Sequence, residues 1–104
     1  MNCTRTLVVL LAVLAGPAAA EEDGDDLLSL MRQPKGRPLA QRYIDSAADK
    51  WDGSGVFCTP EADRADARYN AVKGYLEANP DQLWRPQRYL IIQGLRAAFP
   101  CGKS

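Results

Sequence analysis

Two of the three cysteines in this 104-residue chain, Cys58 and Cys101, constrain its fold more than any other feature. A domain of this size has a marginal core and often needs a covalent staple. In an exported protein two such cysteines most simply form one disulfide, which here would close a loop of about 44 residues. The chain-entropy model gives such a bridge about 4 kcal/mol, a large share of the roughly 5 kcal/mol expected for the whole domain. The alternative, two free buried thiols, would suit only a cytosolic protein.

The first 20 residues are typical of a secretory signal peptide. Arg5 provides a positive start, residues 7–15 form an uninterrupted apolar run, and the alanines at 18–20 fit a cleavage site. The run is shorter than the roughly 20 apolar residues of a membrane span, which argues against a short membrane anchor. Cys3 precedes the run instead of following it, which excludes a lipoprotein. We predict cleavage after about Ala20 and a periplasmic mature protein.

Cleavage would leave one small domain, residues 21–104, in which 12 Lys+Arg (the 13 of the chain less Arg5) face 13 Asp+Glu. Residues 27–104 carry 12 basic and 8 acidic groups. This excess of basic groups is too small and too dispersed to indicate a nucleic-acid-binding surface. We therefore expect neither nucleic-acid binding nor stable membrane insertion. Residues 21–36 are expected to be an acidic, mobile N-terminal segment with a helix of two turns at most, capped by Asp25 or Asp26.

Residues 38–51 have the periodicity of an amphipathic helix. Pro38 suits the first helical position, and the glycine-rich turn at 52–55 ends the helix. The apolar stripe expected to face the core consists of Leu39, Tyr43, Ala47 and Trp51, with Ile44 and Ala48 beside it.

Two further helices are expected at residues 59–79 and 86–99. Thr59 is a natural N-cap with Pro60 at the first helical position, and Pro86 has the same role for the last helix. Pro100 prevents continuation beyond Phe99. Gly94 lies in mid-helix at a cost of about 1 kcal/mol relative to alanine, which a close helix crossing or chance would explain. The predicted core faces are Ala62, Ala65, Tyr69, Val72 and Leu76 in the first helix, and Ile91, Ile92, Leu95, Ala98 and Phe99 in the second.

Nothing alternates with period two for long enough to indicate a strand. We predict an all-α fold, a small helical bundle of three to four helices stapled by one disulfide. The Cys58–Cys101 bridge would tie the start of the 59–79 helix to the end of the last helix. Those two ends meet if the helices pack antiparallel.

The absence of histidine removes most catalytic and metal-binding schemes, and paired cysteines remove thiolate ligation of zinc. We expect no catalytic residue, no metal and no cofactor. Asp45 and Asp49 lie one helical turn apart as candidates for acid–base catalysis, but two solvated carboxylates on an outer face are the favoured interpretation. Trp51 and Trp84 are expected to pack against the chain, whereas an exposed loop tryptophan would indicate a binding hot spot.

Several motifs together resemble the Tai-type immunity family of type VI secretion systems (type VI secretion amidase immunity, Rap/Tai). These are "RYIDSAADKW", F-C-x-P at residues 57–60, "YLEANP", a proline-led helix and "AFPC" at residues 98–101. The resemblance covers about residues 42–101. The most specific part of the resemblance is the combination of F-C-x-P with the distant F-P-C. This combination is specific because it couples a disulfide to two helix-boundary prolines.

The resemblance implies that residues 37–104 form an immunity-type helical domain. Such proteins are periplasmic and often homodimeric, and they block a peptidoglycan amidase injected by neighbouring bacteria. An inhibitor of this kind needs only surface complementarity, which agrees with the lack of catalytic residues. The alternative is an exported helical binding or acid-stress chaperone-like protein without a toxin partner. Partner contacts are expected in the short loops at 52–55 and 79–84, at Asp52, Ser54, Asn79, Asp81 and Trp84.

Overall fold

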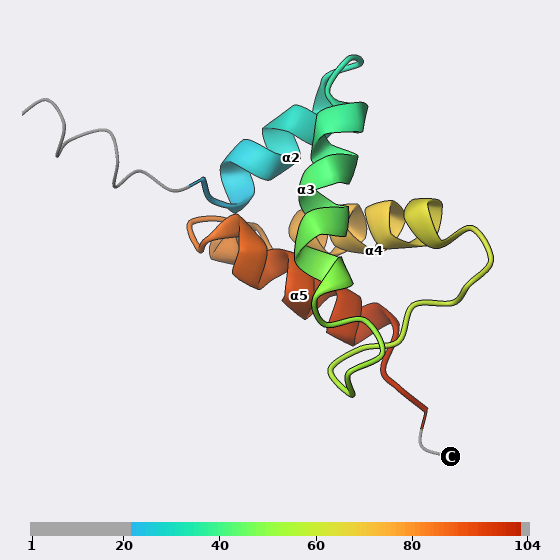
Figure 1. Cartoon of the computed structure of the whole chain (residues 1–104). Helices are drawn as coiled ribbons and strands as arrows, with labels where there is room; N and C mark the ends of the chain where they lie inside the picture. Colours follow the sequence, from blue (N-terminus) through green and yellow to red (C-terminus); the bar gives the residue numbers. More distant parts are fainter. Residues whose placement is uncertain (1–21, 103–104) are drawn as a thin grey trace, which may run out of the picture.

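A computed structural model describes residues 22–102 as a bundle of four α-helices with one short 3₁₀-helix (Figure 1). No β-strand occurs among these residues, which hold two isolated bridges only. The all-α fold stapled by one disulfide is thereby confirmed. The predicted signal peptide, residues 1–20, lies outside the described residues. The elements are α2 (Gly24–Arg32), α3 (Arg37–Asp49), α4 (Arg64–Ala78), η1 (Pro80–Gln82) and α5 (Gln87–Ala98).

Helix α2 forms in the acidic segment and packs into the core. Asp23, not Asp25 or Asp26, is its N-cap, and a capping box joins Asp23 to Asp26. The apolar side chains of α2 that lie in the core are Leu27, Leu28 and Met31. The backbone before and within its first turn is hydrogen-bonded to residues 83–87, which fixes the start of α2 against the start of α5.

Helix α3 starts one residue earlier and ends two residues earlier than the predicted range, and its buried face is rotated. Its core side chains are Ala40, Ile44, Ala47 and Ala48, whereas Leu39 and Trp51 are exposed. The stripe expected to include Leu39 and Trp51 was therefore wrong at both ends. The helix ends at Asp49, so Trp51 no longer follows its periodicity, and the three alanines allow close approach of neighbouring helices.

Helix α4 begins four residues later than the capping signal predicts, at Arg64 instead of Pro60. Thr59 and Pro60 lie in an irregular segment, and Asp63, with φ of 52°, precedes the first helical residue. Long-range bonds explain the delay, because the Cys58 N–H donates to the Phe99 carbonyl (2.8 Å) and the Thr59 N–H to Asp52 (3.0 Å). The first bond holds Cys58 against the end of α5, and the second holds Thr59 against the loop after α3. The core face of α4 is confirmed for Tyr69, Val72 and Leu76, whereas Ala62 and Ala65 are exposed.

Helices α4 and α5 share the most extensive contact between any two elements, and Gly94 lies at their crossing. A Cβ on Gly94 would lie 3.0 Å from the Tyr75 Cβ, so the close crossing accounts for this glycine. The buried face of α5 comprises Leu90, Ile91, Gly94 and Leu95, while Ala98 is exposed. The helix stops before Pro100, and Cys101 bonds to Cys58 with 4.8 Å between their Cα atoms.

Candidate functional site

A buried arginine, Arg68 of α4, joins three carboxylates. Its side chain is 3% exposed. One terminal nitrogen, Nη1, donates to Asp45 (2.8 Å) and Asp49 (3.0 Å), and the other, Nη2, donates to Asp52 (2.8 Å). Asp45 and Asp49, the two carboxylates with acid–base spacing, are thus brought together as ion-pair partners of one guanidinium. We call these four residues the Arg68 cluster.

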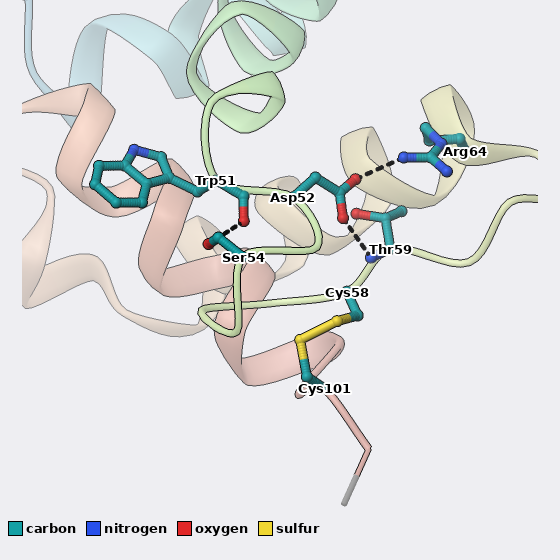
Figure 2. The surroundings of a disulfide bond; sticks show 7 residues. All are labelled: Trp51, Asp52, Ser54, Cys58, Thr59, Arg64 and Cys101. Atoms are coloured by element: carbon teal, nitrogen blue, oxygen red, sulfur yellow. Dashed lines mark hydrogen bonds and ion pairs between the residues drawn. A yellow bond between two sulfur atoms is a disulfide. The ribbon is translucent and has the colours of Figure 1, made fainter.

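Asp52 is the most buried carboxylate of the Arg68 cluster, with a side chain 10% exposed. It also accepts hydrogen bonds from the Arg64 guanidinium (2.7 Å) and the Thr59 N–H (3.0 Å), as Figure 2 shows. Burial alone would raise the pKa of Asp52, but the bonds from Thr59 and Arg68 outweigh it and hold that pKa below its ordinary value. Burial alone would lower the pKa of Arg68, but its bonds to Asp52, Asp45 and Asp49 raise it. Asp52 and Arg68 are therefore both ionised at neutral pH, and Asp52 is directed into the fold.

The loop after α3 turns Trp51 away from this cluster. Gly53 and Gly55 have φ values of 81° and 103°, conformations that glycine adopts without strain. The Ser54 hydroxyl donates to the Trp51 carbonyl (2.6 Å) and closes the turn. Figure 2 shows the Trp51 ring and the Asp52 carboxylate pointing in opposite directions from adjacent positions. Ser54 therefore holds the loop, and Trp51 is the exposed side chain that the loop presents.

The second predicted contact loop, residues 79–84, also separates into structural and exposed parts. Asn79 donates to the Tyr75 carbonyl (2.8 Å) and completes the end of α4. Asp81 is exposed and accepts a bond from Gln82 (3.1 Å). Trp84 is 65% exposed, so the expectation that it packs against the chain was wrong. The loop thus brings one large aromatic side chain to the surface.

Trp84 is linked to α5 through Arg85. The Arg85 guanidinium lies 4.7 Å from the ring centre of Trp84 and 5.3 Å from that of Tyr89. Both distances are within cation–π range. Trp84, Arg85 and Tyr89 therefore form a continuous row that leads from the 79–86 loop onto α5, and we call it the Arg85 row.

Two adjoining hollows, of about 450 and about 500 Å³, lie between the end of α3 and helix α5. Trp51 and Arg88 line both of them, and Tyr89 connects the first hollow to the Arg85 row. We call the two hollows together the α3–α5 groove. The first hollow is also lined by Val56, Ile92 and Arg96, and the second by Lys50.

Three of the five expected contact residues make hydrogen bonds within the fold, and the other two, Asp81 and Trp84, are exposed. Asp52, Ser54 and Asn79 hold the fold, while Trp51, Arg85 and Tyr89 face outward and were not proposed as contacts. The sequence does contain a signal for a basic, aromatic surface at this end of the chain. No acidic residue follows Asp81, although arginines and aromatic residues continue along α5.

Within residues 22–102, no group of three or more His, Cys, Asp or Glu side chains could hold a metal ion. None of the helices in that range combines the length and hydrophobicity that a membrane span requires.

Comparison with protein families gives a match over almost all of the described chain. The model of the Rap1a immunity proteins matches residues 23–101. The chain belongs to the Rap1a immunity protein family. The matched range begins at the N-cap of α2 and ends at Cys101, so it includes all four helices and both disulfide cysteines. This confirms the resemblance at the level of a type VI secretion immunity family. No curated protein and no solved structure matches the chain significantly.

Proposed function

We propose that this protein is a periplasmic immunity protein that binds and inhibits a peptidoglycan amidase effector of a type VI secretion system. The observation that carries the proposal is the match to the Rap1a immunity family over residues 23–101. The amidase as target follows from the Tai-type resemblance, above all from the F-C-x-P and A-F-P-C motifs at residues 57–60 and 98–101.

The proposed location follows from the substrate of the effector. Peptidoglycan lies outside the cytoplasmic membrane, so an inhibitor must reach the same compartment to protect the cell. The signal-peptide pattern of residues 1–20 would deliver it there, and a disulfide between Cys58 and Cys101 persists in an oxidising compartment.

The proposed mechanism is occlusion, without a catalytic step by the immunity protein itself. A protein inhibitor acts by covering surface on its target, for which aromatic and arginine side chains are the most effective contacts. The exposed Trp51, Trp84 and Tyr89 with neighbouring arginines supply this kind of surface.

Co-expression with the type VI amidase effector of the same strain tests the proposal. The amidase is directed to the periplasm of a susceptible Gram-negative host, together with the full chain or with a version lacking residues 1–20. We expect the full chain to prevent lysis and the leaderless version to fail. The purified mature protein should also form a complex with the amidase and stop its cleavage of peptidoglycan. Lysis despite the full chain, with no complex in solution, would reject the function.

A further inference from the structure

Three of the largest exposed apolar side chains lie on one continuous surface, formed by the α3–α5 groove and the Arg85 row. The exposed fractions are 47% for Trp51, 45% for Tyr89 and 65% for Trp84. Trp51 and Tyr89 line the same hollow, and Arg85 bridges Tyr89 to Trp84. Single exposed aromatic residues are common on proteins, but a contiguous set around a hollow marks a binding surface.

All charged side chains that line this surface are cationic. Lys50, Arg88 and Arg96 line the groove, Arg85 extends it, and none of the lining residues of either hollow is acidic. The ion pairs found among residues 22–102 do not involve Lys50, Arg85 or Arg96. Three arginines away from this surface are paired internally: Arg37 with Asp66, Arg64 with Asp52, and Arg68 with the three carboxylates of its cluster.

A second copy of the chain does not fit this surface in a two-fold dimer. A two-fold interface places the same patch on both subunits, so the cations of one copy would face those of the other. Since the groove has no acidic lining residue, the charges of Lys50, Arg85 and Arg96 would be desolvated in such a dimer without a carboxylate from the other copy, at considerable cost. A complementary partner must bring carboxylates to the cations and an apolar group to the aromatic side chains.

We propose that the amidase effector docks on this surface through a segment that carries an apolar or aromatic side chain flanked by carboxylates. The apolar side chain enters the hollow beside Trp51 and Tyr89, and the carboxylates pair with Arg96 and Arg85. Arginine binds carboxylates through two parallel hydrogen bonds, which fixes the orientation of the segment. The inference rests on the proposed function and adds the contact surface and the chemistry of the partner segment.

The test is the affinity of the purified mature protein for the amidase, measured by calorimetry at two salt concentrations. Trp51→Ala, Tyr89→Ala and Arg96→Glu alter the proposed surface. Arg32→Glu is the matched control, because Arg32 and Arg96 both lie in the last turn of a helix and Arg32 lines neither hollow. Thermal unfolding with the disulfide intact confirms that each variant is folded.

We expect each of the three surface variants to weaken binding by at least about tenfold and Arg32→Glu by less than about twofold. Binding of the unaltered protein should weaken as salt rises, and this dependence should be shallower for Arg96→Glu. Tight binding by all folded surface variants would overturn the inference but leave the proposed function standing. No binding by the unaltered protein would reject both. Loss of a dimer in the surface variants without loss of amidase binding would identify a self-interface and overturn the inference.

Discussion

The Arg68 cluster and the α3–α5 groove use the same residue types in opposite ways. In the cluster one arginine, 3% exposed, binds three carboxylates, and the Asp52 carboxylate accepts a further guanidinium and a backbone N–H. In the groove several cations share a surface with exposed aromatic rings and with no acidic lining residue. The two regions meet in the loop after α3, where Trp51 and Asp52 point in opposite directions (Figure 2).

The difference shows that charged residues near a candidate site are informative only when their partners are known. The ion pairs of Arg68 with Asp45 and Asp49 hold α3 and α4 together, and its pair with Asp52 holds the loop after α3. Charges without a carboxylate partner, such as those of Lys50 and Arg96, add little to the fold. Changes in the cluster should therefore unfold the protein, and changes in the groove should alter binding.

The largest loss of folding stability is expected for Arg68→Ala. Removing the guanidinium leaves three carboxylates close together without their shared partner, and breaking a buried ion pair in this way costs about 3–5 kcal/mol. Urea unfolding measures the loss. Lys73→Ala, which breaks an exposed pair with Glu77 on the same helix, is the control and should cost less than about 1 kcal/mol. A similarly small loss of stability in both variants would show that the Arg68 cluster does not hold the fold more strongly than an exposed ion pair.

Loss of the Cys58–Cys101 bridge should have the next largest effect. Disulfides typically contribute about 2–4 kcal/mol, and this one holds the loop that carries both Trp51 and Asp52. We expect reductant to lower the melting temperature of the native protein substantially and to leave a Cys58→Ser/Cys101→Ser variant unchanged. An identical transition with and without reductant would show that the bridge is dispensable.

Acid should weaken the Arg68 cluster through Asp52. The pKa of Asp52 is lower in the folded protein than the roughly 3.9 of an unfolded chain, so this carboxylate stabilises the fold above about pH 4. That contribution is lost as the pH falls through the folded pKa. The native protein should thus be more stable than Asp52→Asn at pH 7, and the difference should shrink below about pH 4. A difference that stays constant down to pH 2 would contradict this assignment.

The smallest effect on stability is expected for Trp84→Ala. Because Trp84 is mostly exposed, its removal should change the free energy of unfolding by less than about 0.5 kcal/mol. Leu76→Ala provides the contrast, since truncating a fully buried leucine costs about 2–5 kcal/mol. A large loss for Trp84→Ala would place this tryptophan among the residues that hold the fold.

The sequence predicted those parts of the fold that depend on local signals. Pro100 marks where the last helix stops, and the Cys58–Cys101 pairing followed from the number of cysteines and the expected compartment. The start of α4 could not be predicted from local signals. The Cys58 N–H binds Phe99, which is distant in sequence, and the Thr59 N–H binds Asp52 in the loop after α3.

The candidate site was predictable only in outline. Short polar loops indicated where the chain is exposed, but hydrogen bonds between helices decide which side chains remain available. Asp52 was a plausible contact until Arg64 and Arg68 were found beside it. Trp51 was assigned to the core stripe because helical spacing was extended past Asp49, where α3 ends.

The most direct test of the proposed contact surface uses the two tryptophans of the chain, Trp51 and Trp84. The mature protein is labelled with fluorotryptophan, and its two fluorine resonances are recorded while unlabelled amidase is added. Complex formation is followed in parallel by size-exclusion chromatography. We expect both resonances to shift or broaden as the complex forms, because both rings lie on the proposed contact surface. A complex that forms while both resonances keep their positions and widths would contradict it.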